Sequence, residues 1–331
     1  MSVLTTNMPD LRSALNGRGI DALRPVLRYN EAGQITANGT LREDEWKQID
    51  EALVPIAKQR LTGIGDLMAR GLVYRVPNGL GKTVLEYEDV SDIAPAQMSM
   101  DALTRGQKDR LEYSVKYLPL PIIHYDYQLS LRVLEASRTK GMPLNVDMAQ
   151  NAARKVAEYA EDILFNGTSS YSFGGGTIYG YCDAPNRNNV TLVKAWNDPT
   201  KTGAEILADV VKMKQASIDA KHFGPWVVYI PTAYETAIDA DFKANSDKTV
   251  RQRLLELGGI EDVKVSDSLA VNNVVLVEMN TNTVRIVEAL PLTNVEWQSE
   301  GPFLTQYKVM TIMVPNIRAD QAGNSGIVHL A

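Results

Sequence analysis

The sequence has few of the residues that build disulfide frameworks, metal sites and membrane spans. Its 331 residues include one cysteine, Cys182, and three histidines, which excludes a disulfide scaffold and any metal site that needs several cysteines. No apolar run approaches the ~18 residues of a membrane-spanning helix. The N-terminus lacks the basic start and apolar stretch of a secretory signal, so we expect an intracellular protein. Basic residues are also in deficit, because 34 Lys and Arg face 40 Asp and Glu, which argues against a dedicated nucleic-acid-binding protein.

The remaining composition is that of an ordinary globular chain. Hydrophobic residues make up 44% and charged residues 22%, so the chain can bury a large core. Its length suggests about two domains or one elaborate domain. Residues 1–42 are broken by glycine and proline without a sustained period, which predicts an arm rather than a domain. This arm is slightly basic, with five arginines against three acidic residues.

A change of period separates the next two regions. Residues 43–71 show apolar positions every three or four residues, which predicts a helix that Pro55 kinks or divides. Residues 72–118 alternate instead, with Tyr113, Val115 and Tyr117 on one face of a strand and an extended arm at 84–90 before it. Five acids and no base lie between Lys82 and Arg105, and a basic stretch follows. We expect a long two-stranded ribbon that needs a supporting surface, because such a ribbon is marginal alone in water.

The clearest helix is predicted at 145–166. Asn145 is a plausible N-cap, an alanine-rich stripe recurs at helical spacing, and Gly167 occupies the position of a left-handed C-cap. The preceding residues 125–140 are read as a short amphipathic segment. The Gly-rich break at 174–176 is interpreted as a linker between domains.

An α/β segment is predicted after this break. Capping boxes at Thr202–Glu205 and Thr232–Glu235 predict two helix starts, and an apolar strand lies between them at 225–230. A further helix is expected at 251–257. The predicted strands after it lie near 263–266, 273–279, 283–289 and 303–314.

The motifs that suggest chemistry are all incomplete. Gly79-Leu-Gly-Lys-Thr83 lacks the first glycine of a phosphate-binding loop and precedes a strand, so a tight turn is expected. His124-Tyr-Asp126 offers two metal ligands without a third. The sequence Gly323-Asn-Ser-Gly326 does not have the spacing of a nucleophile elbow.

Two further groups are interpreted as structural. Cys182 next to Asp183 has no adjacent basic residue, which favours a buried or inert thiol over a nucleophile. Glu161-Asp162 is expected on the solvated side of the 145–166 helix. We therefore predict no catalytic, cofactor-binding or metal-binding residues, no cofactor and no enzymatic activity.

Two stretches carry a resemblance to a known family. The first comprises Trp46-Lys-Gln-Ile-Asp50, Arg70 and Val76-Pro-Asn-Gly79. The second comprises Pro119-Leu-Pro121, Asp126, Arg132, Glu135, Gly141-Met-Pro-Leu-Asn-Val-Asp147, Ala152-Ala-Arg154, Val156-Ala157, Glu161-Asp-Ile-Leu-Phe165 and Gly167. Over residues 43–181 this pattern resembles the HK97-fold major capsid proteins, in particular their encapsulin-like branch.

The resemblance implies an α+β, HK97-like capsid fold with a defined order of parts. These parts are an N-terminal arm (1–42), an N-terminal helix region (43–71), an extended E-loop (72–118), a peripheral domain (119–184) with its spine helix (145–166), an axial domain (185–290) and return strands of the peripheral domain (291–331). In this family the E-loop lies across an adjacent subunit, which agrees with the ribbon's need for support. Some relatives cross-link a loop lysine to an asparagine of another subunit. Lys82 lies at the loop, but no asparagine matches the motif, so no cross-link is predicted.

The function that the resemblance implies is that of a tailed-bacteriophage major capsid protein. The chain would assemble with itself into pentamers and hexamers of an icosahedral head that encloses DNA without sequence-specific binding. Assembly would occur in the host cytoplasm, with no membrane partner and with any scaffolding, portal or decoration protein as a separate chain. The alternative is an encapsulin nanocompartment shell enclosing cargo enzymes, against which the long segment before Trp46 argues. A third hypothesis, an enzyme with an α/β substrate domain, lacks a catalytic constellation.

Overall fold

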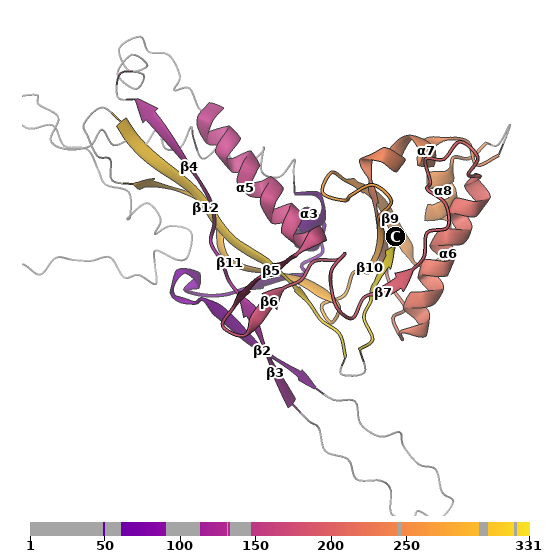
Figure 1. The fold of residues 1–331 in the computed structure, drawn as a ribbon, viewed down its shortest axis with the longest axis horizontal. Coiled ribbons are helices and arrows are strands. Elements are labelled where there is room, and N and C mark those ends of the chain that lie inside the picture. Colours follow the sequence, from indigo (N-terminus) through magenta and orange to yellow (C-terminus); the bar gives the residue numbers. More distant parts are fainter. Residues whose placement is uncertain are drawn as a thin grey trace, which may run out of the picture.

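The computed structural model describes residues 49, 61–90, 113–130, 132, 147–243, 247–297, 304–320 and 323–331. The expected arm at 1–42, most of the helix around Trp46 and the tip of the ribbon lie outside these residues. Within them the chain forms two larger sheets, a two-stranded ribbon, a short hairpin and the helices that cover the sheets (Figure 1). No helix in this described part is long and apolar enough to span a membrane.

The first sheet has four strands in the order β1-β11-β12-β4. These are β1 (Val73–Arg75), β4 (Ile123–Ser130), β11 (Val284–Trp297) and β12 (Leu304–Ile317). The long strands β11 and β12 pair antiparallel, with register shifts between Glu288 and Thr293. β4 continues the antiparallel pattern on β12, and the short β1 runs parallel to β11.

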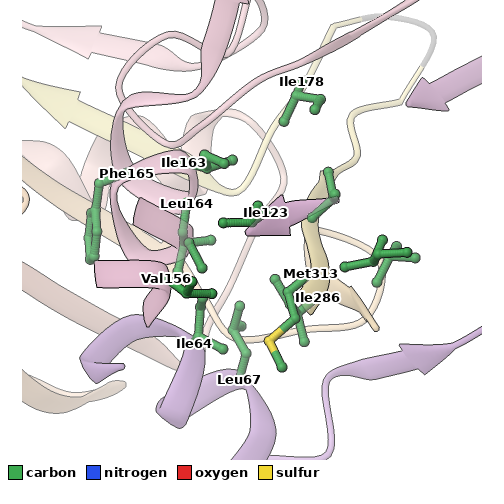
Figure 2. Packing of buried hydrophobic residues seen from close by; sticks show 14 of the residues in the cluster. Ile64, Leu67, Ile123, Val156, Ile163, Leu164, Phe165, Ile178, Ile286 and Met313 are labelled. Atoms are coloured by element: carbon green, nitrogen blue, oxygen red, sulfur yellow. The ribbon is translucent and has the colours of Figure 1, made fainter. Parts of the chain in front are cut away.

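The long helix α5 (Asp147–Asn166) packs on this sheet together with α3 (Thr62–Ala69). Its alanine-rich stripe is buried, and Ala152 and Ala153 are fully inaccessible. Figure 2 shows Val156, Ile163 and Leu164 of α5 beside Ile64 and Leu67 of α3, with Ile286 and Met313 of the sheet close by. The small residues allow close approach, since a Cβ on Gly63 would lie 2.8 Å from the Leu164 Cδ2. The predicted helix and its stripe are thus confirmed; Asn145 lies outside the described residues.

The second sheet has five strands in the order β7-β13-β10-β8-β9. Its strands are β7 (Asn188–Val190), β8 (Trp226–Pro231), β9 (Ile260–Ser266), β10 (Val274–Glu278) and β13 (Ile327–Leu330). The associated helices are α6 (Gly203–Asp219), the 3-10 turn η3 (Thr232–Tyr234), α7 (Glu235–Asp239) and α8 (Val250–Leu255).

The two faces of strand β8 pack into two different hydrophobic clusters. All six of its residues are buried, the pattern of a strand covered on both faces. Val228 and Ile230 pack into the cluster formed with α6 and α8, whereas Val227 and Tyr229 belong to the core around α5. The two sheets therefore share one core through α3 and α5.

The predicted ribbon is present as β2 (Val84–Val90) and β3 (Tyr113–Pro119). These strands pair antiparallel along their full described length, from Val84 opposite Pro119 to Val90 opposite Tyr113. In Figure 1 the ribbon projects away from both sheets. Its root rests on a hairpin made of β5 (Thr168–Phe173) and β6 (Gly176–Ile178).

The glycine run at 174–176 corrects one prediction. It is the turn of the β5–β6 hairpin, not an interdomain linker. Gly174 and Gly175 have φ of 59° and 83°, the left-handed values that favour glycine in tight turns. Gly176 is required by packing, because a Cβ there would lie 2.1 Å from the carbonyl oxygen of Tyr117.

The structure also refines or corrects the sequence analysis at three places. The start of the expected 125–140 amphipathic segment is strand β4, since Ile123, Tyr127 and Leu129 alternate inward. Thr202–Glu205 is a capping box as predicted, but Thr232 opens a 3-10 turn and caps nothing with its side chain. The missed capping box is Thr249–Gln252 at the start of α8.

The sheets also refine the boundary expected near residue 290. β11 begins at Val284 and lies wholly in the four-stranded sheet, whereas β13, near the C-terminus, returns to the five-stranded sheet. The chain therefore crosses between the sheets at 279–283 and again at 318–326. The division into peripheral and axial domains remains a proposal.

Candidate functional site

The residues singled out for chemistry lie apart from one another. No group of three or more His, Cys, Asp and Glu in the described part of the chain could hold a metal ion. His124 Nδ1 lies 3.6 Å from Asp126 Oδ1, and both side chains are about half exposed. Gly79–Gly81 form a 3-10 turn after Asn78, as expected for a tight turn. Gly79 has a packing role there, because a Cβ would lie 2.0 Å from the carbonyl oxygen of Ala289.

Cys182 has the surroundings of an unreactive thiol. Burial raises its pKa to about 12, although Arg187 acts in the opposite direction. The expectation that no basic residue lies near it is therefore corrected, while the high pKa agrees with an inert thiol. Asp183 accepts a hydrogen bond from the backbone N–H of Gly180 at 2.5 Å and so fixes the loop after the hairpin.

Glu161 overturns the expectation that the Glu161-Asp162 pair faces solvent. Only 3% of Glu161 is exposed, and its carboxylate accepts backbone hydrogen bonds from Gly63 at 2.5 Å and Ile64 at 3.2 Å. It thus satisfies N–H groups in the first turn of α3 that have no partner within the helix. Burial raises the pKa of Glu161 to about 7 against the lowering effect of these bonds, and Asp66 raises it further.

Asp66 continues this junction towards the five-stranded sheet. It lies in the last turns of α3 and accepts a hydrogen bond from the Tyr229 hydroxyl at 2.9 Å. Lys264 of β9 forms an ion pair with the same carboxylate. Together Glu161 and Asp66 tie α3 to α5 on one side and to β8 and β9 on the other.

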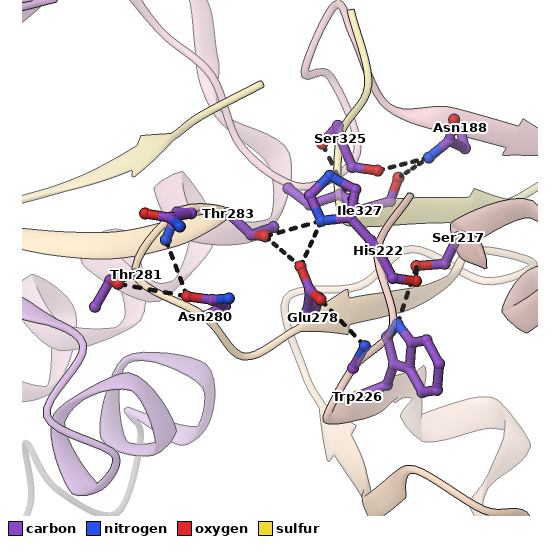
Figure 3. Close-up of polar contacts among 12 residues, drawn as sticks. Asn188, Ser217, His222, Trp226, Glu278, Asn280, Thr281, Thr283, Ser325 and Ile327 are labelled. Atoms are coloured by element: carbon purple, nitrogen blue, oxygen red, sulfur yellow. Dashed lines mark hydrogen bonds and ion pairs between the residues drawn. The ribbon is translucent and has the colours of Figure 1, made fainter. Parts of the chain in front are cut away.

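A second polar junction, around His222 and Glu278, lies where the chain crosses between the sheets (Figure 3). His222 Nδ1 is 2.5 Å from Glu278 Oε2, Thr283 donates to the same oxygen at 2.7 Å, and the Gly224 N–H donates to Oε1 at 3.1 Å. The hydrogen bond to Glu278 raises the pKa of His222 against the effect of burial. The pKa of Glu278 is lowered by His222 and Thr283 although burial opposes this.

Sequence reasoning missed both junctions for different reasons. Glu161 follows Ala157 by four residues and precedes Leu164 by three, so its burial was readable from the same stripe that predicted the helix. His222 and Glu278 are 56 residues apart and no local pattern joins them.

The ribbon presents an exposed face that is both aromatic and acidic. Tyr113, Val115 and Tyr117 are 60%, 48% and 40% exposed. Cross-strand pairing places Glu88 opposite Val115 and Glu86 opposite Tyr117, and paired residues share one face of a sheet. A row of exposed apolar side chains on a projecting ribbon is the kind of surface that binds another protein.

Solved structures identify the class of this fold. The chain superposes on the virus-like particle of Pyrococcus furiosus with a TM-score of 0.62 at 15% identity, covering 86% of this chain and 99% of that one. The capsid of Myoviridae phage XM1 gives 0.61 at 9% identity, with 92% and 98% coverage. The capsid of a native GTA particle gives 0.56 at 15% identity, with 97% and 98% coverage. The fold is therefore the HK97-type fold of capsid and shell proteins.

The sequence comparisons place the chain within a family. Residues 34–330 match the model of a family of unknown function, DUF6260, and the chain belongs to that family. The type 1 encapsulin shell protein of Myxococcus xanthus is 28% identical over 196 residues, which are 59% of this chain and 62% of that protein. The chain thus spans less than two thirds of that curated relative. The sequence comparison and the fold comparison therefore both lead to proteins that form capsids or shells.

Proposed function

We propose that this chain is the major capsid protein of a tailed bacteriophage and assembles into the pentamers and hexamers of an icosahedral head that encloses DNA. The observation that carries the proposal is the extent of the fold match. The XM1 and GTA capsids cover 92% and 97% of this chain and are themselves almost fully covered.

The ribbon supports the assembly role. Its described strands project from the body and expose an aromatic row, and a two-stranded ribbon is marginal without a supporting surface. In this proposal it is the E-loop and lies across an adjacent subunit. The arm at 1–42 is the N-terminal arm, α5 is the spine helix of the peripheral domain, and the five-stranded sheet with its helices forms most of the axial domain.

The net charge suits a container better than a nucleic-acid-binding protein. The chain carries a formal charge of −6, and tight binding to DNA requires clustered basic residues. A shell confines its contents mechanically, so interfaces between subunits must supply the stability. Any scaffolding, portal or decoration protein is a separate chain in this proposal.

The alternative function is an encapsulin shell that encloses cargo enzymes in the cell. The sequence similarity to the Myxococcus xanthus encapsulin shell protein favours it.

The test compares the full-length chain with a variant lacking residues 84–112, both expressed alone. We expect the full chain to form rings, tubes or polyhedral shells in negative-stain electron microscopy, and the deletion variant to fold without forming stable shells. Intact shells from the deletion variant would show that the ribbon is not an assembly element. Small uniform shells that enclose a co-purifying protein, with a low 260/280 nm absorbance ratio, would establish the encapsulin function instead.

A further inference from the structure

A cavity of about 210 Å³ lies at the root of the ribbon. Its walls come from parts of the chain that are far apart in sequence: the strands β2 and β3, strand β6 with the loop that follows it, and the end of β12 with the residues just after it. The volume is below the roughly 300–1,000 Å³ of pockets for drug-sized ligands, so a molecule of metabolite size fits it. The proposed shell function leaves this cavity unassigned.

The charged side chains that line the cavity are basic. They are Lys116 of β3 and Arg318, which follows β12, and no Asp or Glu among the described residues joins them. Arg318 donates one of its N–H groups to the carbonyl oxygen of Glu88 at 3.3 Å, and a guanidinium has five such donors in a fork that matches a carboxylate. Two cations without an anion in the lining create a positive potential, which favours an anionic ligand.

Asn316 of β12 contributes a second, independent feature to the same cavity. Only 1% of this residue is exposed, and neither the oxygen nor the nitrogen of its side-chain amide has a hydrogen-bond partner among the described residues. A buried amide without partners is costly, and native proteins rarely keep one. Because the amide offers both an acceptor and donors, a ligand with a carbonyl next to an N–H group would satisfy it.

The two features together restrict the chemistry of the ligand. The basic side chains favour a carboxylate, since charge-assisted hydrogen bonds to arginine are among the strongest in proteins. An inorganic anion would satisfy these cations and leave the Asn316 amide without a partner. The remaining walls include apolar residues, namely Leu118, Pro185 and Pro315, which suit the short aliphatic part of an organic molecule.

We propose that this cavity binds a small organic acid, in which a carboxylate contacts Arg318 and Lys116 and a neighbouring amide group pairs with Asn316. The bound molecule contacts the ribbon through Lys116 and the four-stranded sheet through Asn316, so it holds the root of the ribbon against the body of the subunit. The site lies within one subunit. Its occupation therefore does not depend on the proposed shell function.

The first experiment measures binding to the purified full-length chain by isothermal titration calorimetry, at protein concentrations below the onset of assembly. The probes are N-acetylglycine, its neutral analogue N-acetylglycinamide, acetate and inorganic phosphate, all at the same ionic strength. We expect N-acetylglycine to bind at least tenfold more tightly than each of the other three. At a hundredfold excess over its dissociation constant it should raise the melting temperature of the chain by about 4 °C.

Two variants test the location of the site. Asn316→Leu should weaken N-acetylglycine binding at least fivefold without weakening acetate binding, and it should melt at the same or a higher temperature, because an apolar side chain of similar size replaces an unpaired buried amide. Arg318→Gln should weaken the binding of both acids at least tenfold. Arg75→Gln is the matched control, since this arginine lies on the same sheet with its side chain 82% exposed, and it should bind like wild type.

Each of the contrary results removes a defined part of the inference. Equal binding of N-acetylglycinamide would overturn the role of the carboxylate, and phosphate binding as tight as that of N-acetylglycine would overturn the organic ligand in favour of a general anion site. The whole inference is wrong if the wild-type chain binds none of the probes, or if both variants bind N-acetylglycine like wild type. These results would leave the shell function standing, because it is tested separately by electron microscopy.

Discussion

The contact of Gly176 with the ribbon allows a sharp test of how the ribbon is held. In Gly176→Ala the new Cβ would lie 2.1 Å from the Tyr117 carbonyl oxygen, 2.6 Å from its carbonyl carbon and 2.9 Å from Pro119 Cδ. Backbone atoms cannot rotate out of the way as a side chain can. The ribbon root must therefore move by about 0.9 Å to restore a 3.0 Å contact.

The expected loss of stability is modest. Overpacking of this kind costs about 1–3 kcal/mol, and replacing glycine offsets about 0.4–1 kcal/mol of that by restricting the unfolded chain. We expect a net loss of about 1–2 kcal/mol in the free energy of unfolding, with the subunit still folded. We expect a larger effect on assembly. The seven-residue strands of the ribbon are roughly 23 Å long, so a shift at the root displaces the ribbon along this whole length.

The assay pairs urea unfolding with electron microscopy of assembled material, and Gly81→Ala serves as the control. Gly81 precedes the same ribbon, but nothing lies within 4 Å of a Cβ built there. We expect this control to keep or slightly gain stability and to assemble like wild type. If Gly176→Ala matches the control in both stability and assembly, the close contact at the ribbon root does not exist as described.

Three further predictions concern the core and the two junctions. Ala153→Glu places an unpaired charge at a fully buried position, which costs several kcal/mol of folding free energy, so soluble subunits should be lost. The exposed-site control Asn151→Glu should stay soluble. Normal assembly of Ala153→Glu would contradict the placement of α5. In the pH range 4.5–7 the folded protein keeps a proton on Glu161 that the unfolded chain has lost, so stability should fall by up to about 3 kcal/mol as pH rises, and Glu161→Gln should remove this slope in urea titrations. The pKa of His222 is raised in the folded protein, so its contribution to stability is complete below its ordinary pKa and is lost as the pH rises through the raised pKa. The pKa of Glu278 is lowered in the folded protein, so its contribution is complete above its ordinary pKa and is lost as the pH falls through the lowered pKa. A double-mutant cycle of His222→Ala and Glu278→Gln should therefore give a coupling of about 1–3 kcal/mol near pH 5.5 and less at pH 9, and a coupling that grows with pH would refute the pairing.

Local sequence patterns predicted several elements of the fold correctly. The alternation that predicted the ribbon and the alanine stripe that predicted α5 are properties of neighbouring residues, and both elements appear where they were expected. Gly167 likewise has the left-handed φ of 69° that its position after the helix required.

The misses arise from contacts between residues distant in the sequence. A glycine run indicates a turn, but only the approach of Tyr117 shows that Gly176 supports the ribbon. The return of β13 to the five-stranded sheet depends on pairing with β10, about 50 residues earlier, which no local period encodes.

The measurement that tests the central claim most directly is the mass of the particles formed by the purified full-length chain, followed by negative-stain electron microscopy over a range of concentrations. A subunit of a capsid-type shell should yield rings of five or six copies, tubes or closed polyhedral particles. A chain that stays a uniform monomer or dimer at every concentration and ionic strength would contradict the account.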